Sequence, residues 1–97
     1  MQYKHGYGVE LEELIGKIGR NKKLMREFLF DILSPAEYRE LSVRWQIVKL
    51  LANDLPHREI SKQLKVSVAT VMRGSRELMN KKGGFRTALQ KYYKHKH

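Results

Sequence analysis

The chain has 97 residues, no cysteine and a formal net charge of +10 at pH 7. That length supports one modest hydrophobic core and leaves no room for a separate catalytic domain, so we expect a single domain. The lack of cysteine excludes a disulfide framework and a thiolate zinc site and fits the cytoplasm. Residues 1–8 lack the apolar core of a signal peptide, and no apolar run is long enough to span a membrane.

The positive charge is concentrated in one half of the chain. Residues 1–56 carry nine Lys or Arg and eight Asp or Glu, whereas residues 57–97 carry eleven and two. A surface so basic binds polyanions by releasing condensed counterions, which makes the affinity sensitive to salt. We therefore expect the second half to bind nucleic acid. The alternative reasons for its charge are solubility and contact with an acidic membrane surface.

The first third of the chain shows helical periodicity and none of the alternation that is typical of strands. We expect residues 1–8 to be flexible, a first amphipathic helix from Val9 to Ile18, and a second helix that Asn21 caps. The second helix has an apolar stripe so broad that it needs a partner. Because a small chain gains stability by burying a face against a second copy, a homodimer is expected.

Ser34 opens a third, longer helix. The sequence Ser34-Pro35-Ala36-Glu37 has the pattern of a capping box, in which Ser34 is the N-cap and the glutamate returns a hydrogen bond to it. Apolar positions at helical spacing continue through this helix (Leu41, Trp45, Val48, Leu51 and Ala52). The helix is predicted to end at about Asn53.

Residues 56–80 have the pattern of a helix-turn-helix. In its first helix, Ile60 and Leu64 lie one turn apart and are predicted to face the core. In its second helix, Ser67 is the predicted N-cap, and the core face holds Val68, Val71, Ser75 and Leu78. The turn contains Lys65 at a place where glycine often takes a left-handed conformation, which lysine adopts at some cost in strain.

The outer face of the second helix begins with small residues and continues with cations, an order that suits entry into a major groove of double-stranded DNA. We predict base contacts for Arg58, Ala69 and Thr70, with Val68 near a thymine methyl. Phosphate contacts are predicted for neighbouring hydroxyl and cationic residues. The predicted DNA-binding set is His57, Arg58, Ser61, Lys62, Lys65, Ser67, Val68, Ala69, Thr70, Met72 and Arg73.

Apolar residues after Gly84, from Phe85 to Tyr93, recur at helical spacing and predict a last helix whose aromatic rings pack in the core. The expected fold class is therefore all-α, with about six helices around a helix-turn-helix. No triad or paired carboxylate spacing indicates an enzyme. Four histidines without acidic neighbours make a poor metal site, so no metal is expected (His5, His57, His95 and His97).

The segment from Ser34 to Leu78 resembles the Trp repressor family. Its most specific part is residues 68–75, Val-Ala-Thr-Val-Met-Arg-Gly-Ser, which is similar to the family's run Ile-Ala-Thr-Ile-Thr-Arg-Gly-Ser. The capping box at Ser34, Arg44 in the third helix and the sequence Arg58-Glu59-Ile60 also match. The resemblance implies an intertwined homodimer of six-helix subunits that represses transcription at a palindromic operator, with L-tryptophan as corepressor.

The resemblance also implies a ligand site. Arg44 and Arg73 match the two arginines between which the indole lies, and a guanidinium suits stacking on an aromatic face. Gly74 matches a position where a side chain would crowd the ring, and Ser34 matches a hydroxyl near the amino group. Glu77 departs from the family's small hydroxyl residue beside the ammonium. Its carboxylate either pairs with that ammonium or reshapes the pocket for another ligand or none.

Two alternatives to a tryptophan-dependent repressor remain open. One is a regulator of the same fold with another effector or none, in which Arg44 and Arg73 contact phosphate. The other is an architectural protein that binds nucleic acid without sequence preference.

Overall fold

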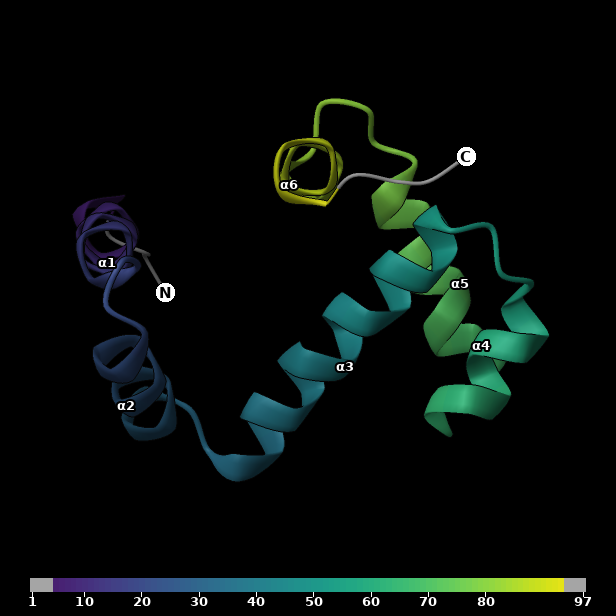
Figure 1. Ribbon diagram of the computed structural model, residues 1–97, viewed down its shortest axis with the longest axis horizontal. Coiled ribbons are helices and arrows are strands. Elements are labelled where there is room, and N and C mark those ends of the chain that lie inside the picture. Colours follow the sequence, from purple (N-terminus) through teal and green to yellow (C-terminus); the bar gives the residue numbers. More distant parts are fainter. Residues whose placement is uncertain (1–4, 94–97) are drawn as a thin grey trace. The chain divides into compact units, whose positions relative to one another are not determined.

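The computed structural model describes residues 5–93, which form six α-helices and no strand (Figure 1). The helices are α1 (His5–Ile18), α2 (Lys22–Ile32), α3 (Pro35–Ala52), α4 (His57–Leu64), α5 (Val68–Leu78) and α6 (Gly84–Tyr92). The predicted all-α fold with six helices is confirmed. The expectation of a flexible tail was wrong for residues 5–8, because α1 begins at His5. None of the helices within the described part is long and apolar enough to cross a membrane.

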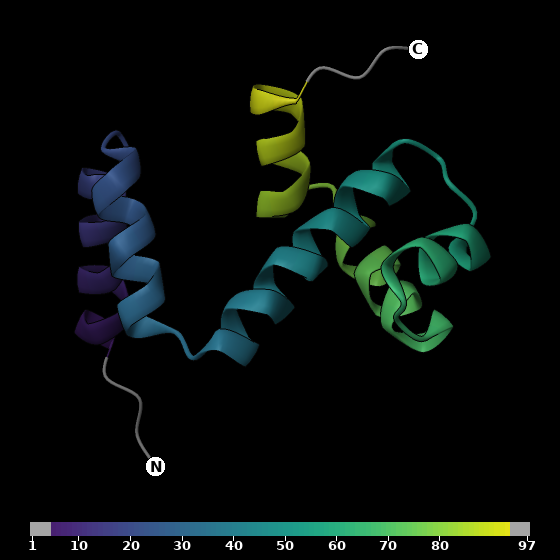
Figure 2. The same ribbon diagram turned by 60° about the horizontal axis from the view of Figure 1, so that its bottom comes forward.

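The chain divides into an N-terminal unit (residues 1–38) and a C-terminal unit (residues 39–97). In the N-terminal unit, α1 and α2 lie side by side (Figure 2). Asn21 caps α2 as predicted, its Oδ1 accepting a hydrogen bond from the Leu24 amide at 3.0 Å. The Phe30 and Tyr38 rings meet edge to face, with centroids 4.9 Å apart. None of the side chains described in residues 6–38 is buried.

The capping box that opens α3 forms as predicted. The Ser34 Oγ accepts a hydrogen bond from the Glu37 amide at 3.1 Å, and the Glu37 Oε1 accepts one from the Ser34 amide at 2.8 Å. Two donors at the start of the helix, which have no partner within it, are satisfied in this way. The first turn of α3 is therefore fixed by local sequence alone.

The C-terminal unit contains two clusters of buried residues, both of which include α3. The first joins Ile47 of α3 to Ile60 of α4 and Val71 of α5. The second joins Val48 of α3 to Leu78 of α5 and Leu89 of α6, with Trp45 and Phe85 packed against it. Because Ile47 and Val48 are neighbours on one helix, α3 is the common support of the helix-turn-helix and of α6.

The turn between α4 and α5 is left-handed at Lys65, with φ 58° and ψ 47°, as the sequence predicted. The Ser61 hydroxyl donates a hydrogen bond across the turn to the Val66 carbonyl. Ile60 and Val71 are fully buried, as expected of the core face. Placing Val68 on the core face was wrong, because its side chain is 40% exposed. It is the first residue of α5.

Helix α6 is held by two polar contacts in addition to its buried leucine. The Arg86 Nε donates a hydrogen bond of 2.8 Å to the Leu78 carbonyl, which caps the end of α5. The Trp45 Nε1 donates one of 3.3 Å to the Tyr93 hydroxyl. Phe85 packs against the second cluster as predicted, and the Tyr93 ring lies against Trp45 of α3. The prediction was wrong for Tyr92, whose side chain is 77% exposed.

Candidate nucleic-acid interface and ligand pocket

The outer face of α4 and α5 is the first candidate site. The inner face of α5 is buried at Val71, Gly74 and Leu78, and α4 is buried at Ile60. Packing of these faces leaves an outward surface of exposed residues, which we call the recognition surface: Arg58, Lys62, Lys65, Ser67, Val68, Ala69, Met72, Arg73 and Arg76. Its five cations and its small residues lie on α4, on α5 and in the turn between them.

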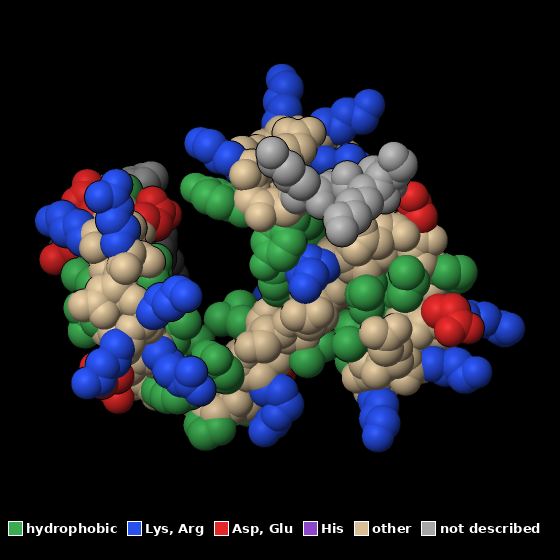
Figure 3. All heavy atoms as spheres, viewed as in Figure 1, with side chains coloured by type: hydrophobic (Ala, Val, Ile, Leu, Met, Phe, Trp, Pro, Cys, Tyr) green, Lys and Arg blue, Asp and Glu red, His purple; other side chains and the backbone are tan. Residues whose placement is uncertain are grey.

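The charge of the chain belongs to the unit that holds this surface. By sequence, the N-terminal unit has six Lys or Arg and six Asp or Glu, whereas the C-terminal unit has fourteen and four. On the face shown in Figure 3, both signs intermingle over α1 and α2, and Lys and Arg predominate around α4 to α6. The C-terminal unit therefore has a net positive charge, although Glu59 and Glu77 are also exposed on α4 and α5, and such an excess of cations attracts polyanions and raises their rate of association.

Most of the residues predicted to contact DNA lie on the recognition surface. Of the other three, Thr70 is exposed but lines the pocket described below, and two are half-buried. His57 is half-buried and lines a shallow depression with Asp54 and Arg86. Ser61 is half-buried, and its single hydroxyl proton is donated to the Val66 carbonyl. Because a phosphate oxygen needs a donor, the Ser61 hydroxyl is unsuited in this arrangement to the predicted phosphate contact.

The first turn of α5 is held by its own side chains. The Ser67 Oγ accepts a hydrogen bond from the Thr70 amide at 3.0 Å and lies 2.9 Å from the Thr70 Oγ1. Ser67 is thus the N-cap, as predicted. The cap fixes the direction in which the exposed start of α5 projects, and a rigid helix start is what base recognition requires.

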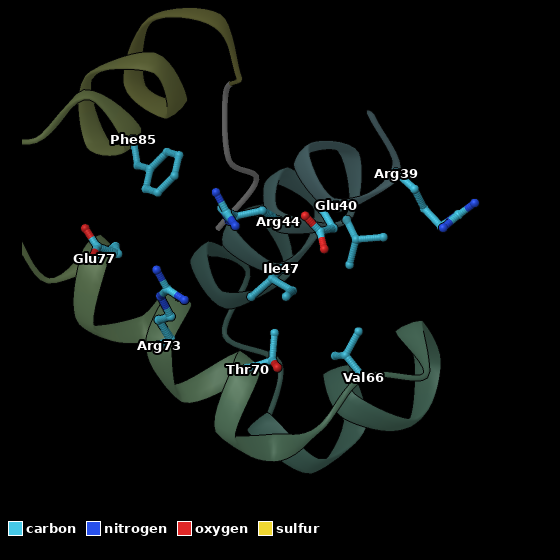
Figure 4. Close-up of a pocket in the computed structure, with 11 residues that line it drawn as sticks. Arg39, Glu40, Arg44, Ile47, Val66, Thr70, Arg73, Glu77 and Phe85 are labelled. Carbon is cyan, nitrogen blue, oxygen red and sulfur yellow. The ribbon is translucent and has the colours of Figure 1, made fainter. Parts of the chain in front are cut away.

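A pocket of about 590 Å³ lies in the C-terminal unit between α3 and α5, with α6 at one end (Figure 4). Arg44 from α3 and Arg73 from α5 approach the same space, with Phe85 and Glu77 beside them, whereas Arg39 points away (Figure 4). The volume is in the range of small-molecule sites. Its lining residues are Arg39, Glu40, Val43, Arg44, Ile47, Val66, Thr70, Arg73, Gly74, Glu77 and Phe85.

Gly74 allows α5 to approach α3 closely. A Cβ atom at this position would lie 2.8 Å from the Cγ2 of Ile47, which is itself 1% exposed. That contact is shorter than van der Waals packing allows, so the absence of a side chain here permits the packing of the two helices. The family resemblance predicted that Gly74 lies beside the ring of a ligand. The structure adds that Gly74 allows α5 to pack closely against Ile47 of α3.

The pocket combines apolar walls with charges of both signs. Val43, Ile47, Val66 and Phe85 provide the apolar surface, and the charged side chains are exposed, which leaves them accessible to a ligand from solvent. Two guanidinium groups can bind a carboxylate or stack on an aromatic ring, and the Glu77 carboxylate can accept hydrogen bonds from an ammonium. The arrangement therefore suits a small zwitterion with an apolar body.

Of the five residues predicted to bind a ligand, four line this pocket: Arg44, Arg73, Gly74 and Glu77. The fifth, Ser34, belongs to the N-terminal unit, and its hydroxyl caps α3. Sequence reasoning missed Ile47, which has the periodicity of a core residue but also forms the pocket floor. It also missed Phe85 as a pocket residue, because its helical spacing indicated only packing.

No group of three His, Asp or Glu side chains that could hold a metal occurs within residues 5–93. His95 and His97, which were considered as adventitious ligands, lie outside the described residues. The side chain of His5 is likewise not described.

Comparison with known proteins agrees with this architecture. The model of the Trp repressor protein family matches residues 10–93. The chain is 44% identical over 54 residues to the Trp operon repressor homolog of Actinobacillus succinogenes, covering 55% of the chain and 54% of that protein. It is 32% identical over 73 residues to the Trp operon repressor homolog of Chlamydia trachomatis serovar L2, covering 74% and 78%.

The first of these matches spans about half the length of the Actinobacillus relative. No solved structure matches the chain. The family model, in contrast, begins within α1 and extends to the residue that follows α6, so it covers α2 to α6 and most of α1. The chain belongs to the Trp repressor family, whose members are transcriptional regulators with a helix-turn-helix and are not enzymes.

Proposed function

We propose that the protein is a homodimeric transcriptional repressor that binds a palindromic DNA operator through α4 and α5, with L-tryptophan as corepressor. The observation that carries this proposal is the double use of α5. One side of the helix, at Thr70, Gly74 and Glu77, lines the pocket, and another side, at Ala69 and Met72, belongs to the recognition surface. Arg73 belongs to both. A ligand that fixes α5 against α3 therefore also fixes the surface that meets DNA.

The pocket supplies the contacts that an aromatic amino acid needs. The indole ring would lie between the guanidinium groups of Arg44 and Arg73, and one of these cations would pair with the carboxylate. The ring would also contact the apolar walls, including Phe85. The ligand would then favour one distance between α3 and α5 over others, because it binds more tightly when the two helices are at that distance.

Glu77 gives the proposed ligand site its own selectivity. The carboxylate lines the pocket beside the two arginines, so a ligand that brings only a negative charge is attracted by the arginines and repelled by Glu77. A zwitterion satisfies both charges. We therefore infer that L-tryptophan binds with its ammonium toward Glu77, and that 3-indolepropionate, which lacks the ammonium, binds less tightly.

The N-terminal unit supports a homodimer. Residues 6–38 bury none of their described side chains, yet they expose several large apolar ones: Tyr7, Val9, Leu11, Leu14, Leu24, Phe30 and Ile32. Helices without a buried face are marginal in water, and a second copy provides a matching apolar face. Two copies would present two recognition surfaces, which bind successive major grooves when they are about 34 Å apart.

Selection from a pool of randomised synthetic duplexes tests the DNA-binding part, at about 150 mM salt with 1 mM L-tryptophan. We expect the recovered duplexes to contain an inverted repeat with half-sites one helical turn apart. Recovery of duplexes without a common sequence, with affinity that falls uniformly as salt rises, would indicate an architectural protein and contradict the proposal.

Calorimetric titration with L-tryptophan tests the ligand part, because Trp45 would interfere with a fluorescence signal from the indole. We expect one ligand per chain, loss of binding in Arg73→Ala, and tighter binding of 3-indolepropionate in Glu77→Ser than in the parent. Lys49→Ala, which changes a cation of α3 outside the pocket lining, is the control and should bind as the parent does. No heat at millimolar ligand, at two temperatures, would leave DNA binding standing and favour another effector or none.

A further inference from the structure

An apolar pair interrupts the basic recognition surface. Val68 and Met72 lie one turn apart on α5 and are 40% and 47% exposed. Neither side chain lines the pocket or the shallow depression beside α4, and neither belongs to a buried cluster. Single exposed hydrophobic residues are common on protein surfaces, but two on adjacent turns of the same outward helix face form one continuous apolar strip.

The surroundings of the strip indicate what covers it. Exposed cations from both helices lie on the same surface, including Arg58, Lys62 and Arg76. An apolar protein surface would leave these charges unpaired. A second copy of this unit would be repelled, because its net charge is also strongly positive. A polyanion that presents apolar groups within a groove satisfies both the cations and the strip. The major groove of duplex DNA does so, because thymine carries a 5-methyl group there.

We propose that Met72, supported by Val68, recognises the 5-methyl group of thymine in each half-site of the operator. This inference rests on the proposed DNA binding and adds the base that is recognised. Met72 has no hydrogen-bond donor, so it cannot identify a base by its oxygen or nitrogen atoms. Its unbranched side chain adapts to the position of a methyl group, whereas the branched side chain of Val68 has restricted χ1 and limits the space beside it.

The family's sequence run gives a physical contrast at this position. Where the family has threonine, with a hydroxyl that donates and accepts hydrogen bonds, this chain has Met72. Replacing a hydroxyl by a thioether removes a polar contact and adds apolar area. Met72 therefore offers apolar area and no hydrogen-bond donor at this position.

The test uses the duplex recovered by selection and versions in which deoxyuridine replaces each thymidine in turn. This replacement removes the 5-methyl group and leaves the hydrogen-bonding groups unchanged. We expect the parent protein to lose affinity about fourfold for each methyl group that Met72 contacts, as burial of one methyl-sized group implies. Other thymidines of the duplex should show no change.

Three variants identify the residue responsible. Met72→Ala should bind the parent duplex less tightly and should no longer distinguish thymidine from deoxyuridine at the sensitive positions. Val68→Ala should reduce the discrimination without abolishing it. Met79→Ala is the matched control, because Met79 is also exposed, at 71%, but lies at the C-cap of α5, and it should keep the full discrimination.

The outcomes separate this inference from the proposed function. Sequence-specific binding with no sensitivity to any deoxyuridine, or full discrimination by Met72→Ala, would overturn the inference and leave the repressor proposal intact. Failure to select any preferred duplex would contradict the repressor proposal itself. Loss of dimers by Met72→Ala in sedimentation, at unchanged thymidine discrimination, would assign the strip to contact between chains and overturn the inference.

Discussion

The two units of the chain are built on opposite principles. The N-terminal unit buries none of the side chains that the structure describes in residues 6–38, and by sequence its charges balance. The C-terminal unit has two buried clusters, and all of the net charge of +10 belongs to it. One unit therefore lacks a core and has exposed apolar surface, whereas the other has a core and presents a charged surface.

This difference separates assembly from recognition. A unit without buried side chains depends on a partner for its stability, and a unit with its own core can hold a recognition surface in a fixed geometry. In the proposed repressor, the N-terminal unit joins two chains and the C-terminal unit binds ligand and DNA. Three of the following predictions compare a change in one unit with a change in the other, and one compares two contacts within the C-terminal unit.

The largest effect on stability is expected when a buried side chain of the C-terminal unit is shortened. Ile60→Ala should lower the free energy of unfolding by about 2–5 kcal/mol, because Ile60 is fully buried against Ile47 and Val71. Leu24→Ala in the N-terminal unit is the comparison, and its effect should grow with protein concentration as dimers form. Urea denaturation at two protein concentrations measures both. Equal losses at every concentration would contradict the separation of the units.

The next effect concerns DNA affinity and compares a base contact with a phosphate contact. Arg58→Ala should weaken binding to the selected duplex by about 1–3 kcal/mol and should relax sequence preference. Lys65→Ala should weaken binding to all duplexes alike and reduce the salt dependence by about one counterion. Titrations at several salt concentrations measure both variants. An equal loss on selected and random duplexes for Arg58→Ala would refute its assignment.

Replacing a glycine by alanine should change the stability of the protein in opposite directions in the two units. Gly74→Ala should destabilise the protein by about 1–3 kcal/mol, because its Cβ would lie 2.8 Å from the Ile47 Cγ2. Gly16→Ala on α1 should stabilise by about 0.5–1 kcal/mol, because nothing lies within 4 Å of its Cβ position and alanine favours helix. Thermal unfolding of the two variants checks the signs. Stabilisation by Gly74→Ala would contradict the close approach of α5 to α3.

The smallest effects are expected at the two helix caps. Asn21→Ala and Ser67→Ala should each cost about 1 kcal/mol of stability, because each removes one hydrogen bond of 3.0 Å to a helix amide. Only Ser67→Ala should also weaken DNA binding, since Ser67 fixes the start of α5. A loss of DNA affinity in Asn21→Ala under conditions where the protein remains dimeric would be unexpected.

Local features of this fold were predictable from sequence. The capping box at Ser34 and the caps at Asn21 and Ser67 depend on interactions within a few residues, so the residue types identify them. The left-handed conformation of Lys65 was predicted from its place in the turn and not from its residue type. Phe85 shows the limit of such reasoning. Its spacing predicted packing, but whether it also borders a pocket depends on how α6 meets α3 and α5, which no local pattern contains.

The ligand site illustrates the same distinction. Arg44, Arg73, Gly74 and Glu77 were found through a family resemblance, and the structure brings them to one pocket. Ile47 was missed because core and pocket floor have the same periodicity. Val68 was misplaced because helical spacing does not show whether the first residue of a helix is covered by neighbouring elements. Periodicity predicts the face of a helix on which a residue lies, but it does not predict which parts of that face neighbouring helices cover.

Amide hydrogen exchange of the full chain, with and without the selected duplex in the presence of L-tryptophan, tests the central separation most directly. We expect added protection in α4 and α5 on binding the duplex, and unchanged exchange in α1 and α2 at a protein concentration where the dimer is already formed. Added protection confined to α1 and α2, or spread evenly over all helices, would contradict it.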